Sequence, residues 1–397
     1  MNRPDNRELN PPARILMGAG PSNVHPRVTR ALTLPIIGFL DPQFIQIMDD
    51  MAELLRQLFG STDSFALPIS GTGSAGMEAG IANLLEPEDT ILVASCGFFG
   101  DRMAEMARRS GAEVIKVSAE WGQAIDPSLV EEQLKANPRI KVLGVTHGET
   151  STGVLQPLEE LSNLAKEYET LFLLDTVTTL GANPISADSL GIDFAFSATQ
   201  KCVGAPPGLA PVNLSQSALR TIAARKQSPS TWYLDLGLLQ GYWQGRTRVY
   251  HHTAPTTMIY SLWEALRMIT EEGLEERYAR HQVNGQALRS GLIALGLRLL
   301  VPSEICLYQL TSVLIPDGVN DVELRTRLRE EYNIEIGGGL NQLQGKIWRI
   351  GTMGESSSAS NVLLLLSAFE NLLPRLGFPV DKGSGVSAAS QEFSSAI

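Results

Sequence analysis

A lysine and an aspartate each follow a short apolar run that is typical of a buried strand. Lys201 lies just past the run at 194–197, among small and apolar residues, and Asp175 ends the run that begins at Leu171. Burial of an amine lowers its pKa and leaves a nucleophile suited to Schiff-base chemistry. A buried carboxylate needs a cationic partner, because an unpaired buried charge is costly. Taken singly, Asp175 also fits a helix cap, and Lys201 fits a lysine that extends to solvent.

A glycine-rich segment between a predicted strand and a predicted helix is a candidate phosphate site. Residues 71–76, with the sequence GTGSAG, fit the dinucleotide motif G-x-G-x-x-G. A dinucleotide site also requires an acidic residue at the end of the next strand, but that strand ends in ASCG at 94–97. What remains is a helix N-terminus whose free amides, with the hydroxyls of Ser70, Thr72 and Ser74, can bind a phosphate. A tight turn with an ordinary N-cap is the alternative.

These three features together match the requirements of one cofactor, pyridoxal phosphate: a phosphate anchor, a partner for the ring nitrogen, and an amine that reacts with its aldehyde. The chain resembles the class V aminotransferases, and among them the alanine–glyoxylate and serine–glyoxylate (serine–pyruvate) group. The resemblance extends over about residues 15–380. It is carried by GAGPSN at 18–23, SGTGS at 70–74, THGETSTG at 146–153, LDTV at 174–177, SATQK at 197–201, APPG at 205–208, YHHT at 250–253 and WRIG at 348–351.

The resemblance implies a role for each matching residue. Lys201 would form the Schiff base with the cofactor and then move the proton of the substrate, while Asp175 would keep the pyridine nitrogen protonated. The other implied contacts are Thr72, Gly73, Ser74 and Gln200 at the phosphate, Phe99, Thr150 and Val177 around the ring, Arg349 and Gly20 at the substrate, and Tyr250 and Thr253 at the cofactor of a partner subunit. Family members often have a tryptophan where this chain has Phe99. From the residues alone, Arg349 also fits a structural salt bridge, and Tyr250 and Thr253 fit a polar loop.

The elements that must position these residues follow a recurring order. Between residues 65 and 196, short apolar runs alternate with helix-period segments, as in a parallel sheet covered on both faces. The resemblance implies fold type I: a large α/β domain with a mainly parallel seven-stranded sheet sandwiched by helices, and a smaller α+β C-terminal domain. We expect an N-terminal arm at 1–23, a large cofactor-binding domain at 24–280, a small domain at 281–381, and a disordered tail at 382–397.

Composition excludes several classes of protein. The 397 residues are 43% hydrophobic and 19% charged, which suits two packed domains. A formal net charge of −11 disfavours a nucleic-acid partner, and the longest apolar run, Val362–Leu366, is too short for a membrane span. The three cysteines indicate neither a disulfide framework nor a zinc site, and the histidines have no ligand spacing, so we expect no metal and a cytoplasmic location.

The predicted function is transamination through pyridoxal phosphate between a small amino acid and a 2-oxo acid, in a homodimer. Alanine or serine would donate its amino group to glyoxylate, giving glycine and pyruvate or hydroxypyruvate. The alternatives are another class V activity, like that of phosphoserine aminotransferase or cysteine desulfurase, and a non-catalytic protein that only binds the cofactor. Cys202 and Cys306 are poorly placed for desulfuration, which needs a mobile cysteine.

Overall fold

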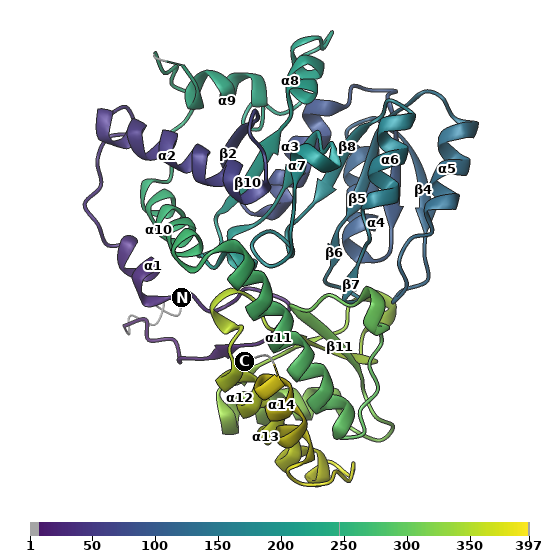
Figure 1. Cartoon of the computed structure of the whole chain (residues 1–397). Helices are drawn as coiled ribbons and strands as arrows, with labels where there is room; N and C mark the ends of the chain where they lie inside the picture. Colours follow the sequence, from purple (N-terminus) through teal and green to yellow (C-terminus); the bar gives the residue numbers. More distant parts are fainter. Residues whose placement is uncertain (1–7, 246, 396–397) are drawn as a thin grey trace, which may run out of the picture.

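The computed structural model describes residues 8–245 and 247–395, which form a larger domain and a smaller one (Figure 1). A seven-stranded sheet runs through the larger domain, and only its strand β10 is antiparallel to its neighbours. The order across the sheet is β2 (Phe65–Ser70), β10 (Leu209–Leu214), β9 (Phe194–Phe196), β8 (Leu171–Asp175), β5 (Ile140–Thr146), β3 (Thr90–Ser95) and β4 (Glu113–Ser118). The predicted α/β fold class is therefore confirmed.

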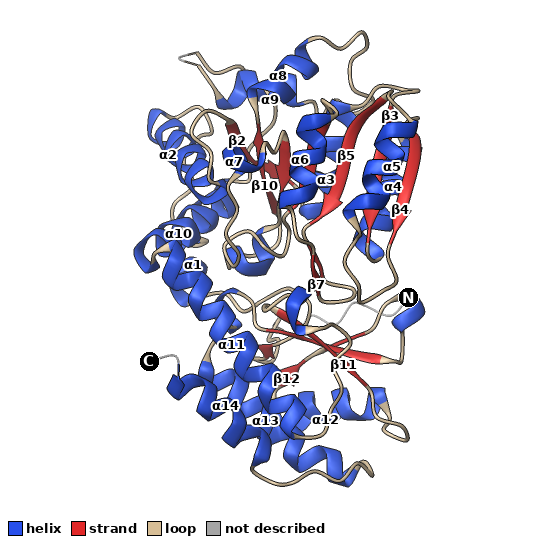
Figure 2. Ribbon diagram, turned by 45° about the vertical axis from the view of Figure 1, so that its right-hand side comes forward, coloured by secondary structure: helices blue, strands red, loops and turns tan. Residues whose placement is uncertain are grey.

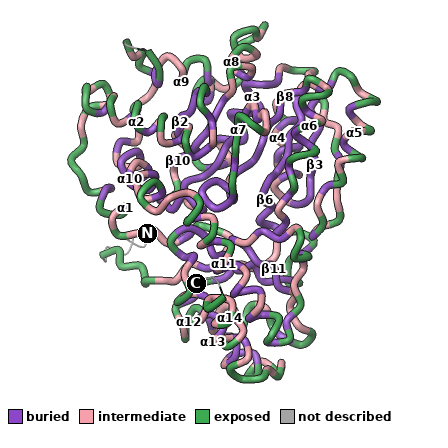
Figure 3. Tube along the Cα trace, in the orientation of Figure 1, coloured by how far each residue is buried: buried purple, intermediate pink, exposed green. Residues whose placement is uncertain are grey.

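Helices cover both faces of this sheet (Figure 2). They are α2 (Pro42–Phe59), α3 (Gly73–Leu84), α4 (Phe98–Arg109), α5 (Pro127–Ala136), α6 (Glu159–Glu167), α7 (Ala187–Leu190), α8 (Gln216–Ala223), α9 (Leu236–Trp243) and α10 (Thr256–Glu272), with the short α1 (Pro26–Ala31) packed on α10. All six residues of β3 are buried, and Figure 3 shows the sheet strands buried between helices whose outer faces are exposed. Burial on both faces explains why the strands read as continuous apolar runs.

The parallel strands all end at one edge of the sheet, where α/β proteins bind their ligands. Thr146 of β5 pairs with Asp175 of β8, and Asp175 pairs with Phe196 of β9. The turn after β9 carries Lys201, and the turn after β2 leads into α3. Strand direction alone therefore brings the predicted lysine, aspartate and phosphate loop to the same edge.

The smaller domain has its own apolar core around Trp348 and Phe369. Its elements are an antiparallel sheet of β11 (Leu310–Leu314), β14 (Ile347–Gly351) and β13 (Gly337–Gly338), the helices α12 (Asp321–Tyr332) and α13 (Ala359–Arg375), and a parallel pair of β1 (Ile15–Leu16) and β12 (Ile334–Glu335). The β1 pairing ties the predicted N-terminal arm to this domain, although residues 1–7 of that arm lie outside the described part. The helical segment expected at 256–295 is two helices, α10 and α11 (Leu274–Ala294), which meet at Gly273.

The tail predicted to be disordered at 382–397 is instead helical over most of its length. Helix α14 (Ser384–Ser395) packs on α11 and α13, and the side chain of Ala389 is fully buried. The buried carboxylate of Glu370 accepts hydrogen bonds of 3.1 Å from the first amides of α14, those of Gly385 and Val386. Low hydrophobicity predicted disorder, but small residues let this helix approach its neighbours closely. Residues 396 and 397 lie outside the described chain.

Charged residues interrupt even the longest helices. Arg277 and Arg289 lie in α11, and Glu53 and Arg56 lie in α2. Within residues 8–245 and 247–395, no helix combines the length and apolar character that crossing a membrane requires. The cytoplasmic location stays a prediction.

A buried charge in α14 tests whether the tail is part of the folded small domain. Ala389→Asp places an unpaired carboxylate in a fully buried position, so we expect it to lower the free energy of unfolding by about 3 kcal/mol. Ser387→Asp introduces the same charge on the exposed face of the same helix and is expected to leave stability nearly unchanged. Equal unfolding midpoints for the two variants in chemical denaturation would contradict the packed helix.

Candidate active site

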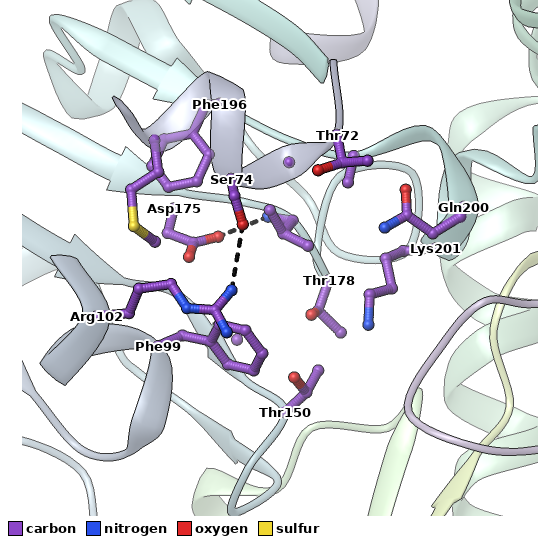
Figure 4. Close-up of a pocket in the computed structure, with 15 residues that line it drawn as sticks. Thr72, Ser74, Phe99, Arg102, Thr150, Asp175, Thr178, Phe196, Gln200 and Lys201 are labelled. Carbon is purple, nitrogen blue, oxygen red and sulfur yellow. Dashed lines mark hydrogen bonds between the residues drawn. The ribbon is translucent and has the colours of Figure 1, made fainter. Parts of the chain in front are cut away.

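A cavity with an empty volume of about 600 Å³ opens at the carboxyl edge of the sheet (Figure 4). Its size suits a small organic cofactor. Nine of the predicted site residues line it: Thr72, Gly73, Ser74, Phe99, Thr150, Asp175, Val177, Gln200 and Lys201. Residues from five separate stretches of the chain therefore meet around one cavity.

Lys201 extends into this cavity from a buried turn. The turn is a wide helical segment, Thr199–Val203, whose backbone leaves helical geometry at Lys201. Burial lowers the pKa of the amine to about 8, and the nearby Arg349 guanidinium lowers it further while Asp175 opposes the shift. Nζ donates a hydrogen bond to the Ala19 carbonyl. The neighbouring Gly20 has φ +101°, and a Cβ there would lie 2.5 Å from Nζ, so the predicted substrate residue Gly20 lies against the lysine.

Asp175 lines the opposite side of the cavity from Lys201 (Figure 4). Its Oδ1 accepts a 2.9 Å hydrogen bond from the amide of Val177. Burial raises the pKa of the carboxyl to about 7, while that hydrogen bond and the cations Lys201 and Arg102 lower it. The site thus holds an amine and a carboxyl whose pKa values lie about one unit apart, on either side of one cavity.

The N-terminus of α3 forms the predicted phosphate cradle. Thr72 is the N-cap residue, and among the described contacts its side chain makes no capping hydrogen bond. A Cβ on Gly73 would lie 2.9 Å from the Cβ of Ala198, so a larger residue would not fit between the helix and the turn before Lys201. The buried Oε1 of Gln200 has no hydrogen-bond partner within the described residues. Free amides at the positive end of a helix dipole suit a bound phosphate.

Sequence reasoning missed six residues of the cavity wall: Met77, Arg102, Gly148, Thr178, Phe196 and Ala198. Arg102 is the most informative of them because it carries a charge. Its guanidinium carbon lies 4.9 Å from the ring centroids of both Phe98 and Phe99, and it donates a 3.2 Å hydrogen bond to the Ser74 hydroxyl. Arg102 follows Phe99 by three residues on α4, a spacing that puts the two side chains on the same helix face.

Arg349 lies beside the cavity rather than in its wall. Its buried side chain projects from β14, donating from Nε to the Gly338 carbonyl at 2.7 Å and from Nη1 to the Thr150 carbonyl at 3.0 Å. The guanidinium therefore reaches from the small domain to the loop that carries Thr150. Its partners are carbonyls and not the carboxylate of a structural salt bridge, and its remaining N–H groups can bind a substrate carboxylate.

Tyr250 and Thr253 do not join the cavity of their own chain. Both are exposed, and the Tyr250 ring lies 5.0 Å from the Phe39 ring. Between them, His252 accepts or donates a 2.8 Å hydrogen bond with Ser70, which anchors this loop beside the phosphate cradle. The described chain therefore leaves these two predicted phosphate contacts apart from the other nine.

The arrangement fits pyridoxal phosphate. A buried amine, a buried carboxyl and a helix N-terminus surround one cavity, with an aromatic ring and Val177 in its walls. An isolated lysine or aspartate would satisfy many roles, but these three at the same cavity match the aldehyde, ring nitrogen and phosphate of this cofactor.

Comparison with known proteins agrees with the geometry. The aminotransferase class-V family matches residues 37–350. (S)-Ureidoglycine–glyoxylate transaminase of Bacillus subtilis (strain 168) is 39% identical, with 98% of each chain covered, and alanine–glyoxylate aminotransferase of Rattus norvegicus is 38% identical, covering 92% of this chain and 89% of its own. The crystal structure of alanine–glyoxylate aminotransferase from Nostoc sp. has a TM-score of 0.91 and 44% identity, covering 93% of this chain and 97% of its own. The chain belongs to the class V aminotransferases, and its cofactor is pyridoxal phosphate.

Proposed function

We propose that this aminotransferase transfers the amino group of alanine or serine to glyoxylate. The observation that carries the proposal is the placement of Lys201 and Asp175 on either side of one cavity that ends at the α3 N-terminus. Relatives that use glyoxylate support the choice of acceptor. The products are glycine and, from the donor, pyruvate or hydroxypyruvate.

Bound pyridoxal phosphate supplies an electron-accepting ring for chemistry at the substrate α-carbon. Lys201 provides the amine that holds the cofactor, and its lowered pKa leaves a substantial neutral fraction near pH 8. Once released, the same Nζ carries the proton that leaves the α-carbon. Asp175 holds a proton at the ring nitrogen through a charge-assisted hydrogen bond.

Other residues orient the reactants. Thr72, Gly73, Ser74 and Gln200 bind the phosphate, with the α3 dipole favouring the negative charge. Phe99 and Val177 pack on the two faces of the ring, and Thr150 lies near its phenolic oxygen. Arg349 binds the α-carboxylate of the donor with its free guanidinium edge, and Gly20 leaves room for the substrate beside Lys201.

A second candidate donor is (S)-ureidoglycine, which the name of the 39% identical Bacillus subtilis relative specifies for that protein. Cysteine desulfuration is disfavoured, because Cys96, Cys202 and Cys306 are the three cysteines of the sequence and all are buried. Burial raises the pKa of Cys202 to about 12, so its thiol is a poor nucleophile. A phosphoserine donor and a non-catalytic role remain outcomes of the activity test.

We propose a homodimer in which Tyr250 and Thr253 bind the phosphate in the partner subunit. The loop from Tyr250 to Thr253 does not reach its own cavity, and large apolar side chains nearby are exposed, among them Trp232, Val249 and Tyr250. Exposed apolar surface of this kind is typical of a subunit interface.

Activity with paired substrates tests the proposal. We expect the highest kcat/KM for alanine or serine with glyoxylate, when each is compared with (S)-ureidoglycine and phosphoserine as donors. Lys201→Ala should lower kcat at least about a thousandfold because it removes the proton-carrying amine, whereas Lys226→Ala on the surface should leave it unchanged. A preference for (S)-ureidoglycine selects the second candidate, and absence of transfer to glyoxylate from every donor refutes the proposal.

The lowered pKa of Lys201 predicts how cofactor capture depends on pH. Only the neutral amine attacks the aldehyde, so the rate at which apoprotein captures pyridoxal phosphate should rise about tenfold per pH unit below 8 and level off above it. Stopped-flow absorbance measures this rate. A rate that keeps rising to pH 10, as for an ordinary lysine, would contradict the assignment, and Lys201→Ala provides the baseline.

Mixed dimers test the contribution of the partner subunit. In a dimer of one Lys201→Ala chain and one chain carrying Tyr250→Phe with Thr253→Ala, one of the two sites has all its residues only if the loop crosses the interface. Refolding equal amounts of the two inactive variants should restore about a quarter of wild-type activity. Each variant refolded alone is the control, and no recovery in the mixture would place the loop's function within one chain.

A further inference from the structure

Glu149 is a buried carboxylate that the proposed mechanism does not use. It is the last residue of β6 (Gly148–Glu149), and its exposed fraction is 0%. The residues on either side of it, Gly148 and Thr150, both line the cofactor cavity, but Glu149 itself does not. A buried charge of this kind is costly unless several donors satisfy it.

Four donors converge on this carboxylate. Oε2 accepts from the backbone amides of Phe99 at 2.9 Å and Gly100 at 3.3 Å, while Oε1 accepts from the amide of Ser151 at 2.9 Å and its hydroxyl at 2.7 Å. The two amides on Oε2 belong to the first turn of α4, where they have no partner within the helix. The positive end of the helix dipole also favours an anion there.

The contact leaves no slack between α4 and the β6 loop. A Cβ on Gly97, the N-cap residue of α4, would lie 2.5 Å from Cγ of Glu149. The Ser151 hydroxyl accepts a further 2.9 Å hydrogen bond from the Phe98 amide. The first residues of α4 are therefore held directly against the loop by both Glu149 and Ser151.

The helix that Glu149 holds carries part of the cavity wall. Phe99 and Arg102 of α4 line the cavity, and Thr150, the residue after Glu149, lies across from Asp175 in Figure 4. The same loop meets the small domain, because the Thr150 carbonyl accepts from Arg349 and the Gly153 carbonyl accepts a 2.9 Å hydrogen bond from the Leu307 amide. A shift of α4 relative to this loop would thus move Phe99 relative to Thr150 and Lys201.

We propose that Glu149 is a positioning residue, which places Phe99 against the cofactor by holding the N-terminus of α4 on the β6 loop. This rests on the proposed function, in which Phe99 packs on the cofactor ring. The carboxylate is needed for its chemistry as well as its shape, because both of its oxygens face donors. Glutamine has nearly the same shape, but its amide nitrogen would point a donor either at the two α4 amides or at Ser151, and one group must move.

The chain contains a matched control, Glu370. This buried carboxylate also accepts from the first amides of a helix, those of Gly385 and Val386, but the helix is α14 in the small domain. Glu149→Gln and Glu370→Gln therefore remove the same kind of helix-end contact. Both should lower the midpoint of thermal unfolding, and the cofactor cavity should be affected only by the first.

The experiment measures the Kd of the purified protein for pyridoxal phosphate, by titrating apoprotein and following absorbance, together with kcat and KM. We expect Glu149→Gln to raise this Kd about tenfold and Glu370→Gln to leave it within about twofold of wild type. In a Phe99→Leu background the additional effect of Glu149→Gln should shrink to about twofold, because the two residues act on the same contact. An unchanged Kd and kcat in Glu149→Gln, or a full additional effect in Phe99→Leu, overturns the proposal.

Ser151→Ala provides a second variant if Glu149→Gln does not fold. It keeps the carboxylate but removes one of its donors and the acceptor of the Phe98 amide, so we expect the Kd to rise about threefold. A wild-type Kd in stable Ser151→Ala protein counts against the proposal. Failure of the wild-type protein to bind pyridoxal phosphate would instead refute the cofactor assignment, so the two failures are distinguishable.

Discussion

Desolvation of two opposite charges is the interaction on which this site depends. Water is excluded from both Lys201 and Asp175, and burial moves the pKa of the amine down to about 8 and that of the carboxyl up to about 7. Each group therefore titrates close to neutral pH, where proton transfer needs little driving force in either direction. The parallel sheet makes this possible, since it brings two buried strand ends to one edge and surrounds them with apolar layers.

Close packing around the charges is the second requirement. Gly20 leaves space for the Lys201 side chain, Gly73 lets α3 approach the turn before that lysine, and Gly97 leaves space for Glu149 at the start of α4. Larger residues at these positions would push the cavity walls apart. The four donors around Glu149 and the two carbonyls around Arg349 then join α4, the β6 loop and the small domain into one frame. We regard this frame as the part of the structure that converts two reactive groups into an oriented site.

Several features of the site could be predicted from sequence because they are encoded locally. An apolar run that ends in Asp175 or precedes Lys201 is itself evidence for a strand end, and parallel strand order implies that the ends meet. The glycine-rich loop predicts a helix N-terminus in the same way. Arg102 was within reach of this reasoning, since its spacing from Phe99 places both on one face of a helix, but no motif directed attention to it.

The sequence by itself determined the fold class, the lysine, the carboxylate and the phosphate loop of this protein, because strand and helix periodicity and short motifs are properties of neighbouring residues. Tertiary structure alone decided that Glu149 lies against α4, that Arg349 reaches the Thr150 carbonyl, and that residues 384–395 pack as a helix on α11 and α13. Each of these contacts joins segments about 15 to 200 residues apart, and whether such segments meet depends on how helices and sheets pack. No local pattern of hydrophobicity or charge records that packing.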